Sequence, residues 1–121
     1  MEKGAIKENS GLHLNFEIFI FEIATEPVGI TKKPLFLLDV REPHEFQISR
    51  IPGSTLIPLG DVPKRWQEIP NDQEIVIHCK AGIRSAKALL FLQQQGYKNL
   101  LNLKGGIDAW VEEVDPSLPR Y

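Results

Sequence analysis

Short apolar runs alternate with amphipathic runs from residue 34 onward. Each apolar run has the length of a buried strand and is bounded by turn-forming or polar residues. The predicted strands cover residues 36–40, 55–57, 74–78 and 99–103. This alternation is typical of an α/β domain with a largely parallel sheet.

The amphipathic runs predict helices at residues 41–46, 62–69, 85–95 and 105–111. Asp61 precedes the second helix and is expected to cap it. Gly96 follows the third helix, where the chain commonly needs left-handed backbone geometry. Two prolines interrupt the tail at residues 115–121, so no helix is expected there.

The first part of the chain, residues 1–33, has a less regular pattern. Between residues 12 and 20 apolar and polar side chains alternate with period two, which predicts a strand. Phe19 and Phe21 interrupt its polar face, so an exposed apolar patch for a partner stays open as an alternative. We expect residues 1–33 to form an arm or an edge strand, and residues 34–121 to form the α/β domain.

Length and charge narrow the classes of function. The 121 residues suit one domain, and 14 basic against 16 acidic residues give a net charge of −2. There is thus no overall cationic field for nucleic acid or an anionic membrane. No apolar run approaches the roughly 20 residues of a membrane span, and the polar first residues lack the apolar core of a secretory signal. We expect a cytoplasmic protein, in keeping with a single cysteine that cannot form an internal disulfide.

The candidate chemistry lies in one segment, His78-Cys79-Lys80-Ala81-Gly82-Ile83-Arg84-Ser85. Cys79 follows a predicted strand and precedes a predicted helix, and open α/β sheets place their sites at that end of their strands. Lys80, Arg84 and the helix N-terminus lower the pKa of such a thiol, and only the thiolate is nucleophilic. Successive backbone N–H groups of this loop are expected to form a nest for a small anionic group.

Three interpretations of this loop remain open from the residues alone. Cys79 and Arg84 are separated by four residues, whereas cysteine phosphatases have five, and the shorter loop suits a sulfur atom better than a tetrahedral phosphate. A small-loop phosphatase or arsenate reductase is the first alternative. A non-catalytic docking module is the second, because the apolar stretch from Phe16 to Phe21 is a candidate surface for a partner. In that case Cys79 is a small buried apolar residue, as a lone cysteine after a strand often is.

Polar residues outside this loop are weaker candidates for a role in the site. Asp39 and Arg41 lie near the end of their strand and are candidates for orienting the loop, although a plain ion pair explains them equally well. His78 is expected to pack away from the thiol, because successive side chains on a strand point to opposite faces. His13, His44 and His78 have no metal-ligand spacing, so no metal site is expected.

Four motifs in order resemble a rhodanese (sulfurtransferase) domain across residues 35–113. They are Leu38-Asp39-Val40-Arg41-Glu42, Ile51-Pro52-Gly53-Ser54, the loop from Cys79 to Ser85, and Gly105-Gly106-Ile107-Asp108-Ala109-Trp110. The Arg84-Ser85 ending of the loop and the segment Asp115-Pro116-Ser117-Leu118-Pro119 are further similar to the C-terminal rhodanese domain of adenylyltransferase/sulfurtransferase proteins of the molybdopterin-synthase sulfurylase type.

The resemblance implies a five-stranded parallel sheet flanked by helices on both faces. It also implies a ping-pong reaction through a persulfide on Cys79, with thiosulfate or a persulfide as donor. Lys80 and Arg84 would draw the donor to the loop, and the backbone amides of Lys80, Ala81, Gly82, Ile83, Arg84 and Ser85 would hold the transferred sulfur. No metal or organic cofactor is implied.

The implied partners are a small-molecule sulfur donor and, as acceptor, a ubiquitin-like sulfur-carrier protein or an adenylyltransferase domain. Two departures from the family pattern stand out. The chain has Ser49-Arg50 where the family often has Gly-His, and residues 25–33 form a poor helix because of Pro27 and Gly29. The first departure removes a histidine from the expected site, and the second leaves the N-terminal third without a clear counterpart in the family.

Overall fold

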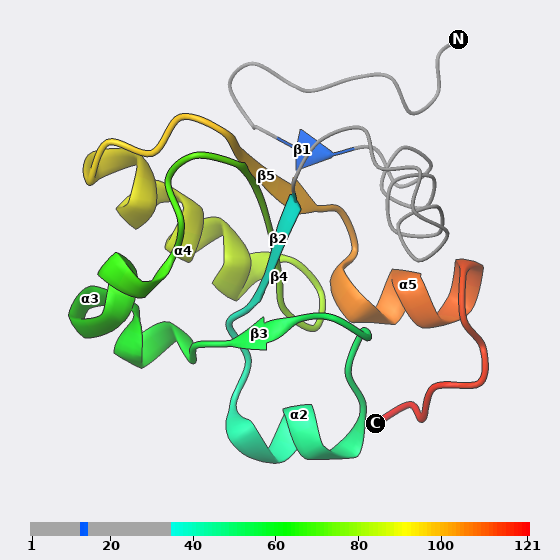
Figure 1. Ribbon diagram of the computed structural model, residues 1–121. Coiled ribbons are helices and arrows are strands. Elements are labelled where there is room, and N and C mark those ends of the chain that lie inside the picture. Colours follow the sequence, from blue (N-terminus) through cyan, green and yellow to red (C-terminus); the bar gives the residue numbers. More distant parts are fainter. Residues whose placement is uncertain (1–12, 15–34) are drawn as a thin grey trace, which may run out of the picture.

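A parallel sheet forms the centre of the computed structural model, which describes residues 13–14 and 35–121 (Figure 1). Its four strands within residues 35–121 are β2 (Leu35–Asp39), β3 (Thr55–Leu56), β4 (Glu74–His78) and β5 (Leu100–Leu103). The two-residue segment β1 (His13–Leu14) pairs with β5, which gives the order β1-β5-β4-β2-β3. All of these pairs are parallel. This sheet is of the α/β type expected from the alternation of apolar and amphipathic runs.

Side chains of the central strands are buried on both faces of the sheet. Every residue of β4 and β5 is buried, which explains why these segments are apolar runs rather than alternating ones. Ile75 and Ile77 of β4 belong to one cluster of the core, and Val76 belongs to the other. The sheet therefore separates two hydrophobic clusters.

The helices cover both faces. They are α2 (Pro43–Ile48), α3 (Val62–Arg65), α4 (Ile83–Gln94) and α5 (Gly106–Glu113), with short 3₁₀ turns at Leu59–Asp61 and Trp66–Glu68. Ala88 and Leu92 of α4 pack in the cluster with Ile77, and Trp110 and Val111 of α5 pack in the cluster with Val76. Figure 1 shows α4 and α5 on opposite sides of the sheet, as the sequence predicts for this fold class.

The predicted elements agree with the observed ones within about two residues, with one exception. The helix expected at residues 62–69 is split into the single turn of α3 and a 3₁₀ turn. Asp61 stands before α3, but its side chain does not cap the helix. A preceding 3₁₀ turn places its backbone at φ −96° and ψ −11°, whereas a capping residue needs an extended conformation. Gly96 has φ 101° and ends α4 as expected.

The N-terminal prediction is tested over two residues. β1 falls within the strand expected between residues 12 and 20, and the rest of that strand lies outside the described residues. The predicted division between residues 1–33 and 34–121 stays a prediction. Within the described part of the chain, no helix is both long and apolar enough to span a membrane.

Candidate active site

The ends of β2 and β4 meet at the carboxyl edge of the sheet and bring the candidate residues together. The Val40 amide donates to the His78 carbonyl over 3.1 Å. Asp39 and Arg41 at the end of β2 therefore lie next to Cys79 at the end of β4. The turn after β4 then enters α4 at Ile83. Ligand sites of open α/β sheets lie at this edge, where the sequence places the cysteine.

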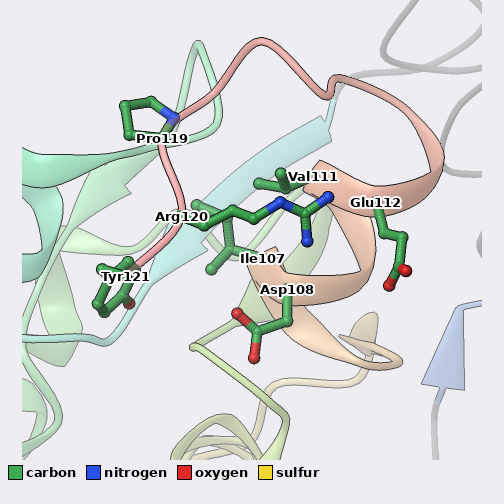
Figure 2. A pocket seen from close by; sticks show the side chains of 7 residues that line it. All are labelled: Ile107, Asp108, Val111, Glu112, Pro119, Arg120 and Tyr121. Atoms are coloured by element: carbon green, nitrogen blue, oxygen red, sulfur yellow. The ribbon is translucent and has the colours of Figure 1, made fainter.

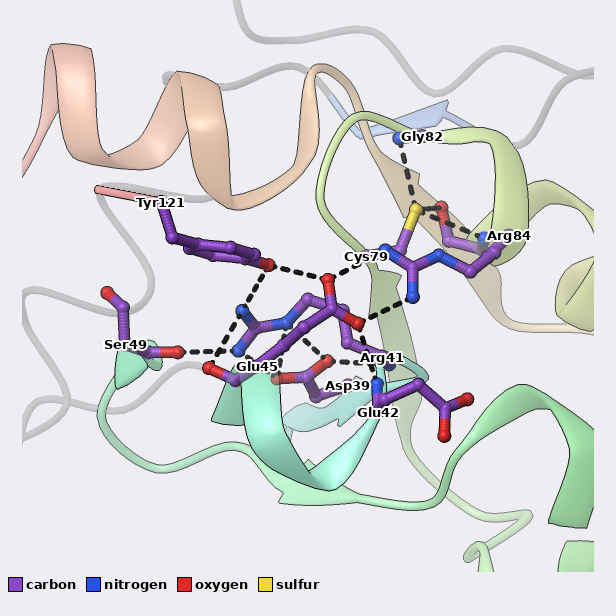
Figure 3. Close-up of polar contacts among 10 residues, drawn as sticks. Asp39, Arg41, Glu42, Glu45, Ser49, Cys79, Gly82, Arg84 and Tyr121 are labelled. Carbon is purple, nitrogen blue, oxygen red and sulfur yellow. Dashed lines mark hydrogen bonds and ion pairs between the residues drawn. The ribbon is translucent and has the colours of Figure 1, made fainter. Parts of the chain in front are cut away.

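The Cys79 thiol is enclosed by its own loop. Only 1% of the residue is exposed. Its Sγ accepts hydrogen bonds from the amide of Gly82 at 3.1 Å (Figure 3) and from the amide of Ser85 at 3.3 Å. The Ser85 hydroxyl lies 3.4 Å from Sγ. Gly82 adopts φ 121°, a conformation that glycine tolerates best, and this turn aims both amides at the sulfur.

The loop favours the thiolate despite its burial. Burial raises the pKa of Cys79, and it is opposed by hydrogen bonds from the Ser85 hydroxyl and from the backbone of Ser85, Gly82 and Ala81. The net result is a pKa below the ordinary value of the thiol. The sulfur also lies at the N-terminal end of the 12-residue helix α4, where the helix dipole favours negative charge. These features suit a nucleophilic cysteine.

Arg84 is held by a carboxylate from another helix. Its Nη1 and Nη2 donate to Oε1 and Oε2 of Glu45 at 2.7 and 3.0 Å, a bidentate pair (Figure 3). The Arg84 guanidinium is the main cause that lowers the pKa of Glu45 from 4.5 to about 2. The Glu42 amide also donates to Glu45 at 2.8 Å, which fixes the carboxylate on α2. Arg84 thus brings a positive charge to the loop while bound to Glu45.

Lys80 points to α5 and the end of the chain. Its Nζ donates to Oδ1 of Asp108 at 2.9 Å and to the main-chain oxygen of Tyr121 at 2.9 Å. The ammonium also lies 4.5 Å from the centre of the Tyr121 ring. Both cations that the sequence places around the thiol therefore have acidic partners in the structure.

Asp39 and Arg41 form a fully buried ion pair. The Arg41 Nη2 lies 2.7 Å from Oδ2 of Asp39 and also donates to the Ser49 carbonyl at 2.7 Å. Its Nη1 donates to the Tyr121 hydroxyl at 2.7 Å, and that hydroxyl donates to Glu45 at 2.9 Å. The pair is thus connected to Arg84 through the side chains of Tyr121 and Glu45, and its role in orienting the loop stays a prediction.

His78 lies away from the thiol. It is fully buried, and its Nε2 is 3.8 Å from Oδ2 of Asp39. Burial lowers the pKa of His78 to about 4, so the imidazole is neutral at physiological pH. Cys79 and Ile77 belong to the hydrophobic cluster beneath α4, and alternation along the strand turns His78 to the other face. This placement agrees with the packing role expected from the sequence.

Comparison with known proteins identifies the family. The family model described as "Rhodanese-like domain" matches residues 28–113. The chain belongs to the rhodanese-like domain family. A solved rhodanese-related protein from Thermoplasma volcanium is 38% identical, with a TM-score of 0.63, and the match covers 66% of this chain and 79% of that one. The expected fold, an α/β domain with a parallel sheet, is therefore that of the family.

Relatives of this rhodanese-like domain include proteins named as sulfurtransferases. A "Sulfurtransferase" from Allochromatium vinosum is 45% identical over 82 residues, which are 68% of this chain and 77% of the relative. The "Probable adenylyltransferase/sulfurtransferase MoeZ" from Mycobacterium tuberculosis is 37% identical over 91 residues, which are 74% of this chain but only 23% of the relative. The chain thus matches most of one relative and about a quarter of the other.

Three residues of the rhodanese-like site are not predicted from the sequence. Glu45 holds Arg84, Tyr121 links Lys80 to Arg41, and the Asn102 side chain accepts a 2.7 Å hydrogen bond from the Ser85 hydroxyl. Asn102 has a signal in the sequence, because it is the polar residue within the otherwise apolar strand β5. Glu45 and Tyr121 have no comparable local signal.

A pocket of about 320 Å³ lies beside the loop, between α5 and the C-terminal segment (Figure 2). Its lining residues are Ile107, Asp108, Val111, Glu112, Pro119, Arg120 and Tyr121. None of them belongs to the cysteine loop, but Asp108 and Tyr121 also contact Lys80. The pocket is thus next to the candidate active site without opening onto the thiol.

Proposed function

We propose that this rhodanese-like domain moves a sulfane sulfur through a persulfide on Cys79. The donor is thiosulfate or a persulfide, and the acceptor is a thiophilic group. The observation that carries the proposal is the enclosure of Sγ by the Gly82 and Ser85 amides at the N-terminus of α4. Such an arrangement stabilises a sulfur anion both before and after transfer.

In the first half-reaction the Cys79 thiolate attacks the sulfane sulfur of the donor. A new sulfur–sulfur bond forms at Sγ, and the donor's own sulfur–sulfur bond breaks. From thiosulfate, the bonding pair leaves with sulfite. Cys79 then carries one additional sulfur.

In the second half-reaction a nucleophilic acceptor attacks the terminal sulfur of the persulfide. The bond to Sγ breaks, and its electron pair returns to Cys79 as thiolate. The two loop amides that contact Sγ stabilise this leaving group. The enzyme returns to its starting state without a metal or an organic cofactor.

The loop cations would attract an anionic donor. Arg84 and Lys80 have side chains that are 32% and 36% exposed, so a sulfonate can approach both while they keep their carboxylate partners. Their pairing with Glu45 and Asp108 reduces the net charge that the donor meets. Under this proposal the backbone of Ala81, Gly82 and Ile83 lines the sulfur site.

The relatives suggest a class of acceptor. MoeZ is named for an adenylyltransferase and a sulfurtransferase, and a further relative from Bacillus subtilis is named a putative sulfur carrier protein. We propose that a ubiquitin-like sulfur-carrier protein, or an adenylyltransferase domain that activates one, receives the sulfur. A cytoplasmic location suits this partner and stays a prediction from the sequence.

The proposal is tested on the intact protein by mass spectrometry. After incubation with thiosulfate and removal of excess donor, we expect the mass of one added sulfur, and subsequent cyanide should release thiocyanate. Cys79→Ser is the control and should show neither signal. Absence of both signals in the unmodified protein, together with turnover of an aryl phosphate or of arsenate, would instead support the phosphatase or arsenate reductase alternative.

A further inference from the structure

The Ser85 hydroxyl lies between two buried groups that compete for its proton. Its Oγ is 2.7 Å from Oδ1 of Asn102 and 3.4 Å from Sγ of Cys79. Ser85 is fully buried and Asn102 is 3% exposed, so water does not substitute for either partner. The three side chains come from the loop after β4, from α4 and from β5, and form one short chain of polar contacts.

A serine hydroxyl has one proton to donate, and Oδ1 of an amide can only accept. The 2.7 Å contact therefore places the proton of Ser85 on the line to Asn102. With its proton so placed, Oγ offers lone pairs to Cys79 and can accept a hydrogen bond from a protonated thiol. At the Ser85 hydroxyl the observed arrangement thus matches the neutral thiol, whereas the amides of Gly82 and Ser85 favour the thiolate. The hydroxyl lowers the pKa of Cys79 only when its proton turns to the sulfur.

Ionisation of Cys79 reverses this preference. The S–H bond breaks, the proton leaves to water, and the electron pair stays on Sγ, which can then only accept. To stabilise the thiolate, the Ser85 hydroxyl must turn its proton to the sulfur. Oγ and Oδ1 would then face each other with lone pairs alone, which costs free energy in a buried site.

We propose that Asn102 is a positioning residue that holds the Ser85 proton and thereby sets how readily Cys79 ionises. Asn102 touches neither the sulfur nor the donor and acts through Ser85. The meaning of this control for sulfur transfer rests on the proposed function, since a thiolate is both the attacking group of the first half-reaction and the leaving group of the second.

Charged and titratable side chains from several elements surround the same loop. They are Arg41, Glu45, Lys80, Arg84, Asp108 and Tyr121 together with Asp39 and the neutral imidazole of His78. None of them bonds to Asn102 in the described contacts, and all are left in place by a change at residue 102. An effect of that change on the thiol is therefore separable from their charges.

The test is a titration of the thiol in Asn102→Leu, which keeps the size of the side chain and removes its acceptor. We expect the acid dissociation constant of Cys79 to rise by about tenfold, which means a lower thiol pKa. The reason is that the Ser85 hydroxyl, without its acceptor on residue 102, donates its hydrogen bond to the thiolate. Thiolate absorbance measures it without ambiguity because the chain has a single cysteine. Cys79→Ser supplies the blank for tyrosine ionisation.

The same substitution in a Ser85→Ala background is the decisive control. If Asn102 acts through Ser85, the thiol pKa of the Ser85→Ala protein does not change when Asn102→Leu is added. A pKa that is unchanged or raised in the single variant, or lowered equally in both backgrounds, overturns the inference. Should Asn102→Leu fail to fold by circular dichroism, Asn102→Val, which suits a strand, carries the same expectation.

The outcome is independent of the proposed function. The titration requires no sulfur donor, so a lowered thiol pKa supports the role of Asn102 even if thiosulfate adds no sulfur to Cys79. Conversely, if the protein forms the persulfide but Asn102→Leu leaves the thiol pKa unchanged, the proposed function is supported and this inference is refuted.

Discussion

Glu45 changes the electrostatic character of the cysteine loop by pairing with Arg84. Without Glu45, Arg84 would present an unpaired cation beside the thiol. With it, the guanidinium is fixed in a bidentate pair across 39 residues of sequence. The carboxylate side chain is only 8% exposed, so its charge depends on Arg84 and on the α2 backbone.

Glu45→Gln should destabilise the protein at neutral pH and reduce its sensitivity to acid. The folded pKa of Glu45, about 2, lies below the ordinary 4.5, so its stabilisation is present above pH 4.5 and disappears as the pH falls towards 2. We expect a loss of roughly 3 kcal/mol at neutral pH, shrinking to little at the acidic end of that window. Urea unfolding across this pH range measures it.

Glu68→Gln is the matched control for that prediction. Glu68 pairs with Arg65 through a similar bidentate contact, but the two side chains are 55% and 40% exposed. Exposed ion pairs contribute little to stability because solvent screens them. A Glu68→Gln protein as unstable as Glu45→Gln would contradict the importance assigned to burial of the Arg84–Glu45 pair.

At the scale of elements, the start of α5 is packed directly on the loop that contains Cys79. The amides of Ile107 and Asp108 donate to the carbonyls of Cys79 and Lys80 at 2.9 and 3.1 Å. Gly106 has φ 60°, and a Cβ there would collide with the carbonyl oxygens of both loop residues. Gly106, the first residue of α5, is thus the point of close contact between α5 and the loop.

Gly106→Ala should displace α5 from the loop. We expect a loss of at least about 2 kcal/mol in unfolding free energy, from backbone strain and from the clash, together with slower sulfur uptake by Cys79. Gly60→Ala is the control, because a Cβ there meets nothing within 4 Å and the residue is exposed. Equal stability of the two variants in thermal unfolding would refute the close packing.

At the scale of the whole molecule, Tyr121 contacts residues from three parts of the site and is connected to a fourth, α5, through Lys80. The Tyr121 hydroxyl accepts from Arg41 after β2 and donates to Glu45 on α2 (Figure 3). The main-chain oxygen of Tyr121 accepts from Lys80 in the loop. Lys80 in turn binds Asp108 on α5. Burial is the main cause that raises the pKa of Tyr121 to about 12, so the hydroxyl keeps its proton at neutral pH.

Tyr121→Phe should loosen this arrangement while it keeps the ring beside Lys80. We expect about 1–2 kcal/mol lower stability from the two lost hydrogen bonds, and a slower first half-reaction because Glu45 and Arg84 are less firmly placed. Tyr97→Phe is matched, since the Tyr97 hydroxyl donates to the Trp66 and Ile69 carbonyls, which lie outside the cysteine loop. If both variants slow sulfur uptake equally, the effect is one of general stability.

The residue pattern alone was sufficient for the order of strands and helices along the chain and for the position of the candidate nucleophile at the edge of the sheet. Alternating apolar and amphipathic runs carry this information locally, and a cysteine between a strand and a helix lies at the carboxyl edge of the sheet in any fold of this class. The helix expected at residues 62–69 was predicted as continuous, but Arg65, at φ −122° and ψ 9°, leaves helical geometry and the chain continues as a 3₁₀ turn.

Only the tertiary structure decided the electrostatics of the site. The pairs Glu45–Arg84, Ser85–Asn102 and Glu45–Tyr121 join residues that are 39, 17 and 76 positions apart. No periodicity or local spacing encodes such contacts, since they arise when separately predicted elements pack around one sheet. The sequence by itself therefore determined which atom is the candidate nucleophile. The fold determined how its charge is balanced, because the interaction energy between charges depends on distances that exist only after packing.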